Sequence, residues 1–218
     1  GRLYDKFRNR LMLPVVDTRG DVVAFGSRVL DKSEPKYMNS SETPVYSKRR
    51  VLYGLNLAKK SKRQGILLCE GNLDIVTLHQ AGFDNAVASM GTALTPEQIR
   101  LLSRFTKELV LCYDNDNAGK TATERALQLL NGTEFSVKVL QLPRRRTEGG
   151  ELVKQDADDF IKNQGPAAFE RLLSGSENGV EFRMAQVAGK YDLGSDEARV
   201  AYSQEISELL ATLPGAVE

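Results

Sequence analysis

Acidic side chains occur in three closely spaced pairs, each soon after an apolar run of the sequence. The pairs are Glu70 and Asp74, Asp114 and Asp116, and Asp156 and Asp158. Carboxylate oxygens are the ligands that Mg²⁺ and Mn²⁺ prefer. An exposed loop or a helix N-terminus explains any single pair equally well, but three pairs in equivalent places favour one shared metal site.

Such a cluster repels itself unless other charges offset it. Two like charges 4 Å apart cost about 4 kcal/mol at an effective dielectric near 20, so several pairs would rival the stability of a whole domain. Bound Mg²⁺, with Mn²⁺ as a substitute, would offset the repulsion; protonation of some carboxylates is the alternative. DNDNAGK, residues 114–120, lacks the spacing of a Walker phosphate loop, and no organic cofactor is expected.

Strand-like and helix-like segments alternate from residue 66 onward. Strands are predicted at 66–70, 86–89, 108–114 and 135–142 with helices between them, a pattern typical of a mostly parallel sheet. In TPEQIRLLSRF, Thr95, Pro96 and Gln98 form a helix-start signal. Ligands bind at the carboxyl ends of parallel strands, which is where the acidic pairs are expected to meet.

The N-terminal segment is basic and predicted to be β-rich. Residues 1–65 hold 15 Lys and Arg against 6 Asp and Glu, whereas residues 66–218 hold 15 against 23. RLMLPVVD and DVVAFGSRVL are joined by DTRGD, which predicts a hairpin, and an irregular basic stretch follows to residue 50. This asymmetry favours a surface facing a polyanion beside a site that needs carboxylates, although two ordinary solvated faces would also explain it.

Length, apolar runs and cysteine content limit the classes of protein to which the chain can belong. With 218 residues, 41% of them hydrophobic, a sizeable core is expected. The charged N-terminus and the lack of long apolar runs predict a cytoplasmic protein with no membrane partner. Cys69 and Cys112 end apolar runs and are expected to be inert core thiols, because two cysteines and His79 cannot complete a structural zinc site. Two amphipathic helices are predicted after residue 175.

An ordered series of motifs resembles a known family. EGNLD (70–74) and DNDNAG (114–119) resemble the TOPRIM domain that primases, topoisomerases and some nucleases share. YDKFRNRLMLPVVDTRGDVVAFGSRVL, PKYMNSSETPVYSKRRVLYGL, ASMGTALT and YDNDNAGKTA are similar, in that order, to the RNA polymerase core of bacterial replicative (DnaG-type) primases, and DADDFIKNQGPAAFERLL extends the likeness to about residue 173. Asn72 stands where the family usually has tyrosine, and Ala157 replaces the proline of Asp-Pro-Asp.

The resemblance implies an α/β fold of the TOPRIM type, Rossmann-like, with a mostly parallel sheet flanked by helices. The domains would be a basic β-rich part at 1–65, the TOPRIM catalytic domain at 66–175, and the start of a helical subdomain at 176–218. The implied activity is metal-dependent synthesis of short RNA primers from ribonucleoside triphosphates on single-stranded DNA, at the replication fork in the nucleoid.

The resemblance also assigns candidate site residues. The acidic metal site would be Glu70, Asp74, Asp114, Asp116, Asp156 and Asp158, of which Glu70, Asp114 and Asp116 are the candidate catalytic residues. The positions that match basic, nucleic-acid-binding or nucleotide-binding motifs are Arg8, Arg10, Arg28, Lys36, Tyr37, Asn39 and Lys48. Arg144 to Arg146 are either a solvated run or a contact to nucleotide phosphates.

The family's zinc-binding module and its helicase-binding region are not recognisable in the sequence. We therefore expect zinc and the replicative helicase to bind outside this chain, and the chain alone to synthesise primers weakly. Two other functions stay open. A TOPRIM nuclease would use the same carboxylates, and a non-catalytic TOPRIM module would bind nucleic acid without a reaction, although such modules generally carry a cysteine zinc motif.

Overall fold

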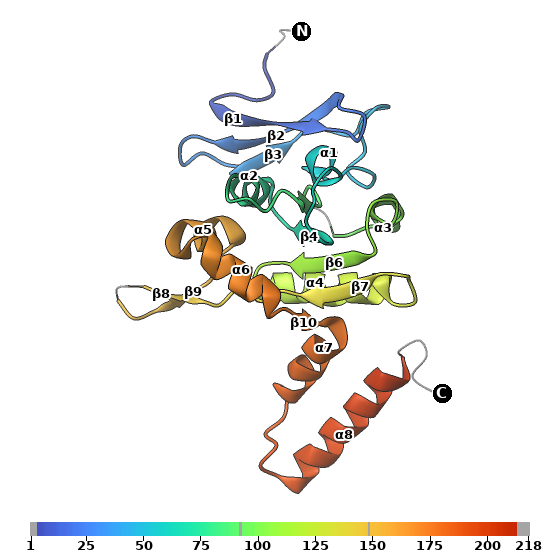
Figure 1. Cartoon of the computed structure of the whole chain (residues 1–218). Helices are drawn as coiled ribbons and strands as arrows, with labels where there is room; N and C mark the ends of the chain where they lie inside the picture. Colours follow the sequence, from blue (N-terminus) through green and yellow to red (C-terminus); the bar gives the residue numbers. More distant parts are fainter. Residues whose placement is uncertain (1–3, 92, 148, 213–218) are drawn as a thin grey trace.

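The computed structural model describes residues 4–91, 93–147 and 149–212. A three-stranded antiparallel sheet lies at one end, a five-stranded and mostly parallel sheet flanked by helices lies in the middle, and two helices extend from the other end (Figure 1). The predicted α/β fold class is confirmed.

The N-terminal sheet consists of β1 (Arg10–Val16), β2 (Val22–Val29) and β3 (Tyr37–Asn39), in that order. The predicted hairpin is present. In its turn, the Asp17 carboxylate accepts the backbone N–H groups of three residues, Arg19, Gly20 and Asp21. The short strand β3 was not predicted, because three residues are too few to show a period.

The central sheet has the order β10-β7-β6-β4-β5. Its strands are β4 (Ile66–Cys69), β5 (Ala86–Ala88), β6 (Glu108–Cys112), β7 (Ser136–Val139) and β10 (Glu177–Asn178). The first four in the chain pair in parallel, as predicted, and β10 adds an antiparallel edge. The prediction was wrong about some ends: β6 stops at Cys112, two residues before Asp114, and β7 stops at Val139 rather than residue 142.

Side chains of the central strands alternate between two buried layers. In β4, Ile66 and Leu68 pack into one hydrophobic cluster while Leu67 and Cys69 pack into the other. This period of two is what a strand buried on both faces requires. Cys69 lies opposite Cys112 in the β4–β6 register, and both thiols are free and buried, as expected.

Helices cover both faces of this sheet. They are α1 (Leu55–Ala58), α2 (Asn72–Gln80), α3 (Pro96–Leu102), α4 (Asn117–Leu130), α5 (Ala157–Gln164) and α6 (Pro166–Ser174). The start of α3 is as predicted, because the Thr95 side chain accepts the Gln98 N–H and the Gln98 side chain accepts the Thr95 N–H. Phe160 of α5 and Phe169 of α6 pack edge to face in the cluster beneath α2.

Three smaller features complete the described chain. A hairpin of β8 (Arg145–Arg146) and β9 (Leu152–Val153) projects beside α5 (Figure 1). The helices α7 (Gly179–Ala188) and α8 (Asp196–Ala211) follow the sheet, as predicted; Phe182 of α7 joins the core, whereas α8 has no buried residue. Among the described residues, no helix combines the length and apolar character that crossing a membrane requires.

Candidate metal site and nucleic-acid interface

Loops at the carboxyl ends of the central strands position two of the three acidic pairs. Glu70 directly follows β4, and Asp74 lies one turn into α2. Asp114 follows β6 by two residues, and Asp116 is the N-cap of α4, where its Oδ1 accepts the Gly119 N–H at 2.8 Å. Because β4 and β6 are parallel neighbours, their following loops meet at one edge of the sheet.

The third acidic pair reaches the same edge from α5. Asp156 is the N-cap of this helix and accepts the Asp159 N–H at 2.7 Å. Asp158 follows in the first turn. The contact between α2 and α5 is direct, because the Asp158 N–H donates to Asp74 Oδ1 at 3.1 Å.

Backbone hydrogen bonds link one acidic pair to the next. Glu70 Oε1 accepts the N–H of Asp114 at 3.2 Å, joining the β4 and β6 loops. Asp74 Oδ2 accepts the N–H of Gly71 at 3.2 Å while its Oδ1 holds Asp158. The carboxylates are therefore fixed by the fold rather than free to swing into solvent.

A cavity of about 400 Å³ opens above this edge. Five of the six predicted acidic residues line it, namely Glu70, Asp74, Asp114, Asp156 and Asp158. Asp116 is not among the described lining residues. It is joined to Asp114 instead through Lys154, whose Nζ lies 2.8 Å from Asp116 Oδ2 and 3.4 Å from Asp114 Oδ2.

Burial and mutual repulsion raise several carboxyl pKa values. Burial, strengthened by the charge of Asp156, raises the pKa of Asp74 to about 7. Burial and then the charge of Asp114 raise the pKa of Glu70, and burial raises that of Asp156. Asp116 differs: the hydrogen bond from Lys154 lowers its pKa. Burial is thus the main cause that disfavours the charged forms of Glu70, Asp74 and Asp156, and repulsion between neighbouring carboxylates adds to it.

We expect the free energy of unfolding of the metal-free chain to fall from about pH 5 to about pH 8. Native Asp74 keeps its proton up to about pH 7, whereas the unfolded carboxyl loses it near 3.8, so the native state binds more protons in this window and rising pH favours unfolding. Glu70 and Asp156 act in the same direction. The Tm should be lower by about 5–10 °C at the higher pH.

Thermal unfolding in a chelating buffer measures this Tm difference. Saturating Mg²⁺ should recover much of the loss at the higher pH, because it binds the deprotonated carboxylates and stabilises the native state. A metal-free Tm that stays level or rises over the same interval would contradict the expectation.

The donor set fits a hard divalent cation. The oxygens of Asp156, Asp158 and Asp159 lie within 4.8 Å of one another. Among the described residues this is the one set of three acids whose oxygens come so close, and Asp159 was not predicted. A cation that takes Oδ2 of both Asp114 and Asp116 would compete with Lys154 for these atoms. The described residues that line the cavity include no cysteine or histidine, and carboxylate oxygens suit Mg²⁺ or Mn²⁺ rather than zinc.

Besides Asp159, the sequence interpretation missed three side chains around these acids. Lys154 bridges Asp114 and Asp116, and Lys162 Nζ lies 2.5 Å from Asp158 Oδ2 one helical turn away. The Thr77 hydroxyl donates to the other oxygen of Asp158. The spacing of Lys162 after Asp158 is a readable i,i+4 signal, but Lys154 and Thr77 reach the acids only through the tertiary fold.

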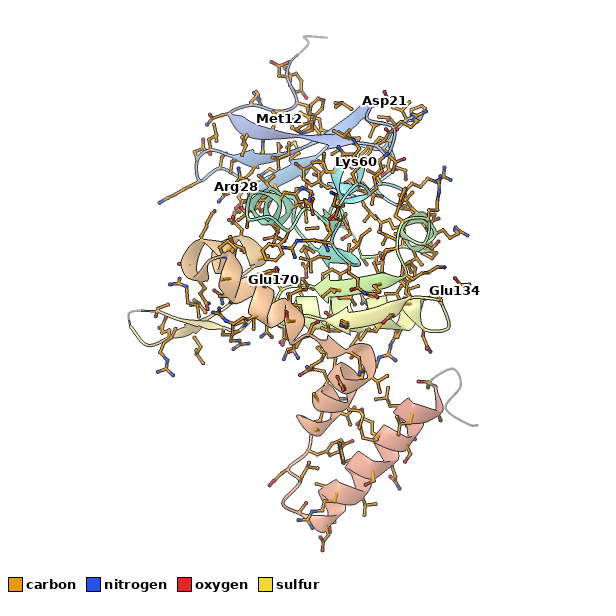
Figure 2. The ribbon with its side chains drawn as sticks, viewed as in Figure 1. Met12, Asp21, Arg28, Lys60, Glu134 and Glu170 are labelled. Carbon is orange, nitrogen blue, oxygen red and sulfur yellow. The ribbon has the colours of Figure 1, made fainter. Side chains whose placement is uncertain are left out.

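Four of the predicted nucleic-acid-binding residues line the same cavity as the acids. They are Arg28, Lys36, Tyr37 and Asn39, from β2, β3 and the loop between them. Figure 2 shows Arg28 between the three-stranded sheet and α2. The Lys36 ammonium lies 5.4 Å from the centre of the Tyr37 ring, and Asn39 donates to the Met90 carbonyl at 3.2 Å. A basic and aromatic wall therefore faces the acidic edge.

The other three predicted residues lie outside the described lining of this cavity. Arg8 is exposed beside the Tyr4 ring. Arg10 donates to the Pro35 carbonyl at 2.8 Å, and its Nη1 is buried without a hydrogen-bond partner in the described structure. Lys48 is half-buried, and its carbonyl accepts the Gln98 side chain. Their predicted contact with nucleic acid stays a prediction.

Three family models match the chain in succession. They are the N-terminal domain of the DNA primase catalytic core at residues 1–59, a Toprim-like domain at 67–161, and the DnaB-helicase binding domain of primase at 180–218. The last match corrects the sequence interpretation, which did not recognise a helicase-binding region in this chain. Amphipathic helices of ordinary composition carry no short motif, so only a comparison of the whole segment detects the likeness.

Known proteins resemble the chain over nearly its whole length. A DNA primase of Clostridium acetobutylicum is 39% identical over 97% of this chain and 34% of that protein. The chain thus spans about a third of the length of the curated relatives it matches.

Solved structures show the same fold. A DnaG primase catalytic domain bound to single-stranded DNA is 35% identical, with a TM-score of 0.82 over 99% of this chain and 68% of that one. The E. coli primase catalytic core is 36% identical, with a TM-score of 0.80 over 98% of this chain and 67% of that one. The likeness in sequence and in fold extends over nearly the whole chain, and the chain belongs to the bacterial DnaG-type DNA primase family.

Proposed function

We propose that the chain carries the catalytic centre of a DNA primase and joins ribonucleotides into short RNA primers on single-stranded DNA. The observation that supports this is the cavity in which acids from three loops face Arg28, Lys36 and Tyr37. Acids that hold divalent cations and a basic wall that holds phosphates are the two parts that nucleotidyl transfer requires.

The acids would hold Mg²⁺, which Mn²⁺ can replace. Glu70, Asp74, Asp114, Asp116, Asp156 and Asp158 are the proposed ligands, with Asp159 added by its closeness to Asp156 and Asp158. When bound, such cations would stabilise the 3′-oxygen that attacks the α-phosphate and the oxygen that leaves with pyrophosphate. Hydrogen bonds from backbone N–H groups orient Glu70 and Asp74 before any ligand binds.

Glu70 is the residue best suited to move a proton. It lines the cavity, its Oε1 accepts the Asp114 N–H, and burial raises its pKa above that of an ordinary glutamate, which strengthens it as a proton acceptor. We propose that it accepts the proton of the attacking 3′-hydroxyl.

The basic wall would bind the template and the incoming nucleotide without reading their sequence. Arg28 and Lys36 would contact phosphates, and the exposed Tyr37 ring would stack on a base. The related catalytic domain was solved with single-stranded DNA, which supports this choice of template. We also propose that residues 180–218 contact the replicative helicase, at the replication fork in the bacterial nucleoid.

The experiment supplies single-stranded template, Mg²⁺ or Mn²⁺ and four ribonucleoside triphosphates, and resolves the products on a gel. We expect short, ribonuclease-sensitive products that disappear when the metal is chelated. A parallel reaction without nucleotides tests the nuclease alternative, because cleavage of the template there would replace the primase assignment. Template binding with neither product would favour a non-catalytic module.

A further inference from the structure

The ammonium of Lys154 occupies the place between two proposed metal ligands. Its Nζ donates to Asp116 Oδ2 at 2.8 Å and approaches Asp114 Oδ2 at 3.4 Å. A divalent cation shared by these two carboxylates would stand within a few ångströms of the same point. A cation that binds through the same Oδ2 atoms would compete with the Lys154 ammonium for them, and the two positive charges would repel each other.

The fold delivers Lys154 to this place. The next residue, Gln155, is 2% exposed and donates its side-chain amide to the Pro143 carbonyl at 2.6 Å, which closes the base of the β8–β9 hairpin. On the facing loop, the Asn115 side chain donates to the Leu142 carbonyl at 2.9 Å. Gln155, next to Lys154, and Asn115, between Asp114 and Asp116, are therefore both held against residues 142–143.

The contact itself is exchangeable. The side chain of Lys154 is 58% exposed, and those of Asp114 and Asp116 are 27% and 32% exposed. Ion pairs with this much access to water are weak, and a doubly charged ion that binds two carboxylates competes well against one ammonium. Lys154 is thus placed to neutralise the pair and also free to leave it.

The triphosphate of a bound nucleotide would lie close to this point. Mg²⁺ is usually held by one or two carboxylates and by substrate phosphates together, so a triphosphate bound through it would lie beside Asp114 and Asp116. A displaced Lys154 would stay anchored through its neighbour Gln155 and would remain near that triphosphate. Lysine is well suited to such a contact because its ammonium is a compact charge with three donors.

We propose that Lys154 exchanges partners: it pairs with Asp114 and Asp116 when no divalent cation is bound, and with the triphosphate of the incoming nucleotide once a cation holds those carboxylates. This inference rests on the proposed function, since it needs the metal and nucleotide sites. It makes Lys154 a nucleotide-binding residue that also protects the acidic pair in the empty protein.

The test measures two affinities in three variants. Mn²⁺ binding is followed by electron paramagnetic resonance without nucleotide, and ATP binding is followed by equilibrium dialysis with saturating Mn²⁺. Lys154→Met removes the charge, Lys154→Arg keeps it, and Lys60→Met removes an exposed charge that lies outside the described lining of the cavity and has no ion pair in the described part of the chain. Thermal unfolding checks that each variant is folded.

Lys154→Met should bind Mn²⁺ about tenfold more tightly and ATP about tenfold more weakly. Lys154→Arg should lie nearer the parent, and Lys60→Met should change neither affinity by more than about twofold. If Lys154 had a purely structural role, its replacement by methionine would not strengthen Mn²⁺ binding and weaken ATP binding at the same time. If Lys154→Met leaves either affinity unchanged, or changes both in one direction, the exchange is wrong. A parent chain that binds neither Mn²⁺ nor ATP would instead refute the proposed function, and the inference with it.

Discussion

Asp116→Asn is expected to reduce metal-dependent primer synthesis on the order of 10²–10³-fold while the chain stays folded. The change removes one negative charge and one metal-binding oxygen from the acidic edge. It keeps the start of α4, because asparagine caps helices as well as aspartate does and its side-chain oxygen can still accept the Gly119 N–H. The loss should therefore appear in activity and in Mn²⁺ affinity, with little change in Tm.

Asp17→Asn is the matched control for this loss of charge. Asp17 also uses its carboxylate to accept backbone N–H groups, but in the β1–β2 turn and outside the described cavity lining. Asparagine there should leave primer yield and metal affinity near those of the parent. Gel assays of primer yield at equal protein concentration measure the difference. Equal yields from the parent and Asp116→Asn would remove Asp116 from the mechanism.

Gly119→Ala should destabilise the chain and displace Asp114. A Cβ at position 119 would lie 2.0 Å from the Asp114 carbonyl oxygen and 2.8 Å from its carbonyl carbon, and these backbone atoms cannot move without moving the site. We expect a loss of about 3 kcal/mol or more, which corresponds to a Tm lower by about 6–12 °C, and much weaker Mn²⁺ binding. Alanine in place of glycine usually stabilises a helix, so the expected change in the free energy of unfolding has the opposite sign here.

Gly175→Ala separates this clash from a general effect of glycine replacement. Gly175 ends α6 with a negative φ, and its added Cβ would meet only the carbonyl oxygens of Arg171 and Leu172, at 3.6 and 3.8 Å. That substitution should shift the Tm by no more than about 3 °C. Differential scanning calorimetry measures the Tm of both variants and of the parent. Similar Tm values for Gly119→Ala and the parent would show that the close approach to Asp114 does not constrain the loop.

The sequence predicts the central sheet because its strands obey a simple rule. Apolar runs such as ILLC in β4 are buried on both faces, so their length and composition identify parallel strands directly. Parallel strands then fix where the following residues meet. This is why Glu70 and Asp114, far apart in the chain, were correctly expected at one edge. Asp156 lines the same cavity, but it arrives at the start of α5 after the β8–β9 hairpin and not at the end of a parallel strand as predicted.

The missed features depend on contacts between distant segments. Lys154 looks like any lysine of a charged loop until the hairpin folds back over Asp114 and Asp116. The clash that keeps residue 119 a glycine involves a backbone oxygen that no residue pattern reveals. Strand ends were placed too late because the apolar run continues past β6 into Tyr113, which is buried outside the strand.

Anomalous diffraction from crystals of the chain soaked in Mn²⁺ tests directly whether the acidic edge binds divalent cations. We expect anomalous peaks at about 2.1 Å from carboxylate oxygens at the acidic edge. Asp114 and Asp116 should be among the ligands, and the Lys154 ammonium should have moved away from them. Peaks confined to other surfaces, or none at a Mn²⁺ concentration that supports primer synthesis, would contradict it.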